Sequence, residues 1–377
     1  MSEQAPAPAN SPAKNDAPRT NSAGRFAHID GMRAFAVMLV VVAHAGAGGI
    51  VPGGSGVTIF FAISGFIITY LVLRERDRTD GFSVRGFYFR RAAKIVPPFI
   101  VAVLVPSLIW AIWNPIDWWA LAAEVFFFFN WVKMSTGYLV MPGTGVVWSL
   151  SIEEQFYLVF AVLWLLIVGL RRWRAVLASV AALALIASVT ARFVLAAFPG
   201  TEERIYYGTD TRMGGIALGV LAAVLLHLWM QQGSPSTWWS RVIGSDAAFV
   251  GALALYLASL LIRDEWFRDT FRFLFQSVAA SIVILYGFMG RRTRLKTFFQ
   301  AASAWRPVAL IGLASYSIYL IHLTAIDAVS PLFVSWPVWA SVIVLATFGT
   351  GIGIAIYYAV EVPVLRWRHR RERVISR

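Results

Sequence analysis

The 377-residue sequence contains no cysteine and few charged residues. The lack of cysteine excludes disulfide bonds, a thiolate nucleophile and a thiolate metal site, and no other metal constellation is visible. Charged residues make up 14% of the chain, whereas a soluble domain carries about 25%. Hydrophobic residues make up 58%, and apolar runs of roughly 17 to 25 residues, long enough to cross a bilayer, recur along the chain. The sequence therefore predicts an all-α polytopic membrane protein.

Acidic residues are scarce, since 20 Asp and Glu face 33 Lys and Arg, which gives a formal net charge of +13. In a membrane protein, basic cytoplasmic loops that face anionic lipid explain such an excess, so we expect no nucleic-acid partner. Residues 1–24 are rich in Ala, Pro, Ser and Asn and lack the pattern of a signal peptide. We expect them to form a disordered cytoplasmic tail.

Ten apolar spans are predicted along the rest of the chain. They cover 33–50, 55–73, 95–113, 147–169, 174–198, 212–230, 246–262, 271–289, 308–333 and 337–360. Lys and Arg cluster in every second connection, which places both termini in the cytoplasm and requires an even number of crossings. The short apolar stretch 118–131 is therefore expected to be re-entrant or interfacial. This predicts a multi-pass protein of the plasma (inner) membrane, with a transmembrane domain at 25–362 and a basic cytoplasmic tail at 363–377.

Several ionisable residues fall inside these apolar segments, where they are costly and usually functional. They are His44, Glu124, Glu153, Glu154, Arg192, His322 and Asp327. At a rise of about 1.5 Å per residue, His44 and the Glu153–Glu154 pair should lie at similar depth below the outer face. An imidazole beside a carboxylate could act as a base with an orienting partner. A structural contact between helices is the alternative.

Arg33 and His44 are eleven residues apart, which is close to three helical turns, so both should lie on one face of the first span. A ligand with anionic groups at the cytosolic mouth and a long thin arm, such as coenzyme A, would touch both. The basic run at 89–98 adds Arg90, Arg91 and Lys94, which are suited to phosphates. Such a run can also serve only to set topology.

Two other patterns favour packing over chemistry. His322 and Asp327 have the spacing of a soluble glycerolipid acyltransferase motif, but on a continuous helix their side chains would point about 140° apart. "GGSG" (53–56) and "ISGF" (63–66) lack the strand–turn–helix setting of a serine nucleophile. Glycines that let helices approach closely explain these two stretches better.

Six ordered stretches resemble the successive motifs of the acyltransferase family 3 membrane proteins. They are "DGMRAFAVMLVVVAHAG" (30–46), "GVTIFFAISGFIITYLVLRE" (56–75), "FYFRRAAKIVPPF" (87–99), "WSLSIEEQFYLVF" (148–160), "RMGGIALGVLAA" (212–223) and "SYSIYLIHL" (315–323). Members of this family are integral-membrane O-acyltransferases that modify surface or secreted glycans, lipopolysaccharide, peptidoglycan or macrolides. The resemblance runs from about residue 26 to 360, and the short C-terminal remainder resembles members without an extra hydrolase-like domain.

The resemblance implies roles for individual residues. His44 falls on the catalytic histidine of an Arg–ten residues–His pattern that Arg33 begins. The family's cytosolic basic motif falls on Arg90, Arg91 and Lys94, where Lys replaces the commoner Arg and loses bidentate geometry. Its intramembrane "WS…EEQFY" motif contains Glu153 and Glu154.

The sequence thus predicts an O-acyltransferase, with O-acetyl transfer as the favoured reaction. Acetyl-CoA or another acyl-CoA would be a donor substrate, with no tightly bound cofactor, and Arg33, Arg90, Arg91 and Lys94 would hold its phosphates. His44 would act as general base or acyl carrier, oriented by Glu153 or Glu154. A glycan, lipid-linked sugar or small hydroxylated molecule would accept the group, and four further residues would contact substrate: Trp148, Ser149, Tyr316 and His322. A proton-coupled exporter that uses the same His and Glu is the alternative.

Overall fold

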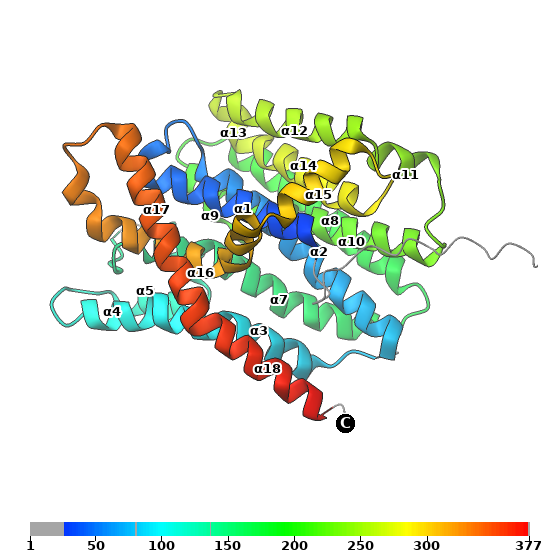
Figure 1. The fold of residues 1–377 in the computed structure, drawn as a ribbon, viewed down its shortest axis with the longest axis horizontal. Coiled ribbons are helices and arrows are strands. Elements are labelled where there is room, and N and C mark those ends of the chain that lie inside the picture. Colours follow the sequence, from blue (N-terminus) through cyan, green and yellow to red (C-terminus); the bar gives the residue numbers. More distant parts are fainter. Residues whose placement is uncertain (1–25, 80, 136, 376–377) are drawn as a thin grey trace, which may run out of the picture.

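The computed structural model describes residues 26–79, 81–135 and 137–375, which form helices and loops without any strand (Figure 1). The expected tail at 1–24 lies outside these residues. The α-helices are α1 (Ala27–Val42), α2 (Gly53–Thr79), α3 (Val84–Phe99), α4 (Val105–Trp110), α5 (Trp118–Val125), α6 (Phe129–Val132), α7 (Val147–Ile167), α8 (Trp173–Leu195), α9 (Glu202–Tyr207), α10 (Thr209–Gln231), α11 (Trp238–Ile243), α12 (Asp246–Leu261), α13 (Glu265–Thr270), α14 (Arg272–Phe288), α15 (Arg294–Ala304), α16 (Arg306–Val329), α17 (Val338–Ile356) and α18 (Val362–Ile375).

Every predicted span coincides with a helix, so the all-α polytopic membrane fold is confirmed. Within the described residues, eight helical segments are long and apolar enough to cross a membrane. The other two predicted spans correspond to α12 and α14, which are apolar but shorter, with 16 and 17 residues. Three segments include a π-helical turn, and one of these, Ala43–Ala47, extends α1 and contains His44.

The stretch 118–131 does not form a spanning helix. It consists of α5 and α6, two short helices separated by a turn in which Phe127 has a φ of 57°. A positive φ is unfavourable for a bulky residue and interrupts the helix there. Glu124, Phe129 and Asn130 are fully buried, so the stretch packs into the bundle.

The centre of the bundle contains α1, α2 and α16, with α12 and α14 on one side and α3 and α18 on the other (Figure 1). Helix α2 packs closely against α10 because both carry glycines where they meet. A Cβ atom on Gly65 would collide with the backbone carbonyl of Ile216, and one on Gly219 would collide with that of Ala62. The expectation that the glycine of "ISGF" serves helix packing is confirmed.

Helix α17 continues through a π-helical turn (Tyr357–Glu361) into α18. The segment after residue 362, expected to be a basic tail, is therefore helical as far as Ile375. It runs beside α3 at one end of the bundle (Figure 1). This contact places Glu361 next to the basic run of α3.

Candidate functional site

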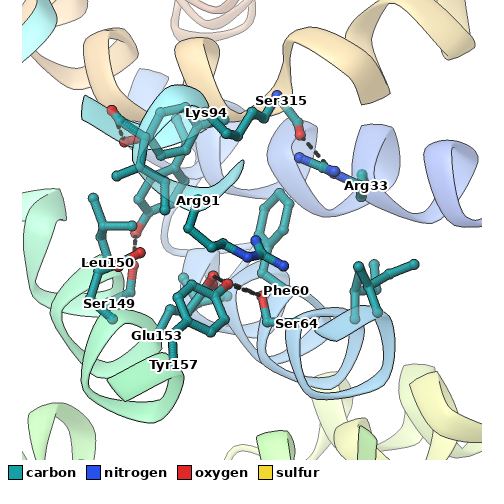
Figure 2. Close-up of a pocket in the computed structure, with 17 residues that line it drawn as sticks. Arg33, Phe60, Ser64, Arg91, Lys94, Ser149, Leu150, Glu153, Tyr157 and Ser315 are labelled. Carbon is teal, nitrogen blue, oxygen red and sulfur yellow. Dashed lines mark hydrogen bonds between the residues drawn. The ribbon is translucent and has the colours of Figure 1, made fainter. Parts of the chain in front are cut away.

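A cavity of about 120 Å³, with charged residues in a largely apolar lining, opens among α1, α2, α3, α7 and α16 (Figure 2). Three cationic side chains line it, Arg33 from α1 and Arg91 and Lys94 from α3. Residues three apart lie on one face of a helix, which is why Arg91 and Lys94 reach the same cavity. Arg90 is not among the lining residues, because its guanidinium lies 2.6 Å from Glu75. The structure thus brings together three of the four expected phosphate ligands.

Each of the three cations is held by a different contact. The Arg33 Nε donates a hydrogen bond to Ser315 Oγ at 3.1 Å. The Arg91 guanidinium lies 4.5 Å from the ring centre of Tyr157. Lys94 forms an ion pair with Glu361, a buried residue that lies just beyond the last predicted span and was missed for that reason. These contacts fix the positions of the charges, and Arg91 retains guanidinium N–H groups for a ligand.

The two predicted carboxylates also line this cavity. Glu153 accepts hydrogen bonds from Ser64 Oγ at 2.7 Å and from Tyr157 at 2.9 Å (Figure 2). Arg91 and Arg33 lie within electrostatic range of Glu153, and Arg91 also lies within range of Glu154. The carboxylates therefore face the cationic part of the cavity.

His44 pairs with another histidine. Its Nδ1 lies 2.9 Å from Nε2 of His322, and the two rings are stacked at an interplanar angle of 23°. The Nδ1 of His322 contacts the carbonyl oxygens of Tyr319 at 2.8 Å and Ile318 at 3.2 Å. A carbonyl can only accept, so this Nδ1 carries the proton and the neutral His322 ring offers its Nε2 as an acceptor. His44 must then donate from Nδ1, which leaves the lone pair of its own Nε2 free.

The expected pairing of His44 with Glu153 is not formed. The Glu153 carboxylate is occupied by Ser64 and Tyr157, one turn along α7, whereas His322 occupies the position beside His44. The expected depth of Glu153 was counted from the start of its apolar run in the sequence. That count does not determine how far α7 is shifted along α1, and so it does not determine which side chains meet. The shared face of Arg33 and His44 is confirmed, since both bond to α16, at Ser315 and His322.

Tyr319 lies between the cavity and the histidine pair. Its hydroxyl and Ser149 Oγ are 2.7 Å apart, and both residues line the cavity. The Tyr319 ring centre is 5.8 Å from that of His322. His44 is exposed at the end of α1 and, within the described residues, does not contribute to the cavity lining. Tyr319 thus borders both the cationic cavity and the His44–His322 pair.

The predicted substrate contacts divide into two groups. Ser149 and Tyr316 line the cavity, as expected for residues that meet a ligand there. Trp148 instead packs in an aromatic cluster, with its ring centre 5.2 Å from Tyr206 and 5.0 Å from Tyr207. His322 is fully buried and contacts His44. Ser64 and Tyr157 were not predicted, because a hydroxyl in an apolar helix gives no distinctive pattern in a single sequence.

The arrangement can hold an anion and can accept a proton. Three cations line the cavity, and the free Nε2 of His44 is available as a base or nucleophile. No three His, Asp or Glu side chains in the described parts of the chain gather closely enough to hold a metal ion. The free imidazole nitrogen and the carboxylates of these residues offer acid–base and nucleophilic chemistry.

Comparison with known proteins is consistent with this chemistry. A family model described as an acyltransferase domain matches residues 26–361. A Staphylococcus aureus (strain COL) protein named "Putative O-acetyltransferase" is 29% identical over 335 residues, which cover 81% of this chain and 51% of that protein. The O-acetyltransferase OatA of S. aureus strain NCTC 8325 is 26% identical over 357 residues, 89% of this chain and 56% of OatA. The chain spans about half the length of these relatives. No solved structure matches it significantly.

Proposed function

The chain belongs to the acyltransferase family 3, and on that premise we propose that it is a membrane O-acetyltransferase that uses acetyl-CoA. The observation that carries the proposal is the joint presence of a cation-lined cavity and a histidine with a free Nε2. Arg33, Arg91 and Lys94 supply three positive charges from two helices, which suits the phosphates of coenzyme A. His44 supplies the base or nucleophile that acyl transfer needs.

The donor would bind with its phosphates at the cations and its pantetheine arm directed toward Tyr319. Lys94 already pairs with Glu361, so this lysine must share its charge with the ligand. Among the described residues Arg91 has a ring contact with Tyr157 and lies near Glu153 and Glu154 without a hydrogen bond to either, so it is the cation best able to reorient toward a phosphate. The thioester reaches His44 when the side chain of Tyr319 moves aside, because Tyr319 lies next to His322.

The reaction uses the free nitrogen of His44 in one of two ways. As a general base, Nε2 takes the proton of the acceptor hydroxyl while the hydroxyl oxygen attacks the thioester carbonyl and the coenzyme A thiolate leaves. As a nucleophile, Nε2 attacks the thioester carbonyl and coenzyme A leaves as the thiolate; the acceptor hydroxyl oxygen then takes the acetyl group from Nε2, and the hydroxyl proton ends on the thiolate. His322 fixes the Nδ1–H of His44 in both cases.

The acceptor would approach from the side opposite the donor. His44 is exposed near the end of α1, eleven residues from Arg33, and the basic loops at the Arg33 end favour the cytoplasm. The acceptor hydroxyl therefore belongs to a glycan, lipid-linked sugar or small molecule on the outer side of the membrane. Glycan analysis of a deletion strain for one missing ester would identify it.

Acetyl-CoA turnover by the purified protein tests the proposal. The protein in nanodiscs should release free coenzyme A thiol when acetyl-CoA and a hydroxylated acceptor are both present, and His44→Ala should not. A proton-coupled exporter would leave the thioester intact. Unchanged acetyl-CoA in the presence of extracted cell-envelope glycans would contradict the enzyme assignment.

A further inference from the structure

Two arginines, away from the cavity described above, are buried inside the bundle. Arg192 of α8 is 2% exposed and Arg212 of α10 is 3% exposed. Within the described residues neither forms an ion pair with a carboxylate. A buried charge without a partner is strongly unfavourable, and charged residues in membrane helices normally pair or bind a ligand.

The contacts around the two guanidinium groups leave N–H donors unused. Arg212 Nη2 donates to Thr58 Oγ1 at 3.2 Å and lies 3.4 Å from the Gly54 carbonyl, but its Nη1 is buried without a hydrogen-bond partner. The Nε and Nη1 of Arg192 are also buried without partners. Arg192 lies in the last turn of α8, where the helix dipole favours a cation by at most about 2 kcal/mol but supplies no acceptor for these groups.

The two positive charges lie close enough to repel each other. Both guanidinium groups lie against the ring of Phe273, with their Cζ atoms 3.6 Å from the ring centre for Arg212 and 5.9 Å for Arg192. Two like charges that lie against the same ring in a low-dielectric interior repel each other. An anion between the two groups would remove this repulsion and accept hydrogen bonds from the unused donors.

A small cavity lies at this place and is lined by both arginines, Thr58 and Ser277. Its volume is about 10 Å³, close to the minimum that holds one water molecule. A water could accept hydrogen bonds, but it carries no charge, so the two guanidinium groups would be compensated only by the aromatic rings around them. A phosphate or sulfate is several times larger than the cavity. The charge therefore favours an anion, and the small volume favours the smallest one, a monatomic ion that enters when the side chains lining the cavity move slightly apart.

We propose that Arg192 and Arg212 bind a single halide ion, which is chloride under physiological conditions. Arg204 differs from these two arginines, because both of its terminal nitrogens already bond to Asp210, at 2.6 and 2.7 Å.

Anion binding at this place also affects the candidate active site. Arg212 Cζ lies 5.7 Å from the ring centre of Trp148, which directly precedes the cavity residue Ser149. A bound chloride thus stabilises the beginning of α7.

Thermal unfolding of the purified full chain tests this site. At equal sodium concentration and ionic strength, chloride or bromide should raise the Tm above its value in gluconate by about 3 °C. Arg192→Met and Arg212→Met should abolish this difference whatever their own Tm. Arg204→Met should retain the difference, because Arg204 already has a carboxylate partner. Equal Tm in chloride and gluconate for the unsubstituted protein would overturn the proposal, as would a halide response that persists in Arg192→Met.

Two further measurements locate the ion and its size. Crystals grown in bromide should show anomalous scattering between Arg192 and Arg212, and bromide found only elsewhere would overturn the assignment. Phosphate that stabilises the protein when chloride does not would likewise overturn it, since the cavity would then open to an oxyanion. These measurements do not depend on acetyl transfer, so their failure leaves the proposed enzyme activity unaffected.

Discussion

At His44, the hydrogen bond to His322 determines which ring nitrogen can react. The Nδ1 of His322 donates to backbone carbonyls of its own helix, so the chain of donors runs in one direction, from His44 to His322 to the carbonyl of Tyr319. A second group that fixes the tautomer of a reactive histidine is a common device, usually provided by a carboxylate or carbonyl. Here a neutral imidazole provides it, which requires no buried negative charge.

The first prediction concerns His44 itself. His44→Ala should lower the rate of acetyl transfer by about 10²–10⁴ or more, because the proton acceptor or acyl carrier is lost. His44→Gln should be equally inactive, since an amide keeps hydrogen bonding but lacks basicity. Acetyl-CoA should still bind both variants, which equilibrium binding can measure. A well-expressed His44→Ala protein with substantial activity would reduce His44 to a helix contact.

The second prediction separates His322 from His44. His322→Ala should lower kcat and leave the KM for acetyl-CoA nearly unchanged, because His322 positions the base without touching the donor. His322→Gln should restore part of the rate, since its side-chain oxygen can replace Nε2 as the acceptor for His44. Equal loss in the Ala and Gln variants, with lowered Tm in both, would indicate a purely structural role for His322.

The third prediction concerns the cations of the cavity. Arg33→Ala and Arg91→Ala should raise the KM for acetyl-CoA more than they lower kcat, because phosphate binding stabilises ground and transition states alike. Arg85→Ala offers a matched control, since Arg85 lies on α3 but is exposed and outside the cavity lining. A fall in kcat alone for Arg33→Ala would reassign Arg33 to catalysis.

At the scale of elements, α16 aligns the site. Ser315 and His322 are seven residues apart, which is two turns along one face of α16. Ser315 bonds Arg33 and His322 bonds His44, so α16 runs in the same direction as α1 and its π-helical extension. Periodicity within one helix predicted the shared face of Arg33 and His44 correctly. It could not predict that His322 rather than Glu153 meets His44, because the tilt and axial shift between helices depend on packing.

The fourth prediction tests the close contact between α2 and α10. Gly65→Val should lower the stability of the purified protein by about 1–3 kcal/mol or more, because the new side chain would collide with the backbone at Ile216. Gly251→Ala is the matched control, since a Cβ at that helical position meets no atom within 4 Å. Its stability should stay within about 1 kcal/mol of the original. Thermal unfolding in detergent can compare the two variants.

At the scale of the whole molecule, composition and hydropathy correctly predicted the all-α membrane fold, and each predicted span coincides with a helix. The cavity was only partly predictable, since charge patterns identified Arg33, Arg91 and Lys94 but also included Arg90, which faces Glu75. Glu361 lies just outside an apolar run, so the sequence did not indicate a role for it. In the structure α17 continues into α18, and this places Glu361 beside Lys94. Contacts between helices that are distant in the sequence depend on side-chain packing, which the patterns of a single sequence do not predict.

The orientation of the whole molecule determines from which side the donor enters. The segment 74–94 holds seven Lys and Arg residues and includes Arg91 and Lys94 of the cavity, whereas 199–212 holds two. Positive-inside bias therefore favours the cytoplasm for the part of the cavity that Arg91 and Lys94 line, and this is the orientation we propose. In this proposed orientation, the exposed end of α1 with His44 lies toward the outer face.

The fifth prediction tests this orientation with reporter fusions. A reporter that is active only outside the plasma membrane should be silent when fused after Gly81 and active when fused after Gly200, because these loops lie at opposite ends of the predicted crossings. A reporter that works only in the cytoplasm should give the complementary pattern, which controls for poor expression of either fusion. The opposite pattern with both reporters would place Arg33, Arg91 and Lys94 at the outer face. A cytosolic acetyl-CoA could not then reach them, and the direction of acyl transfer proposed for this chain would be wrong.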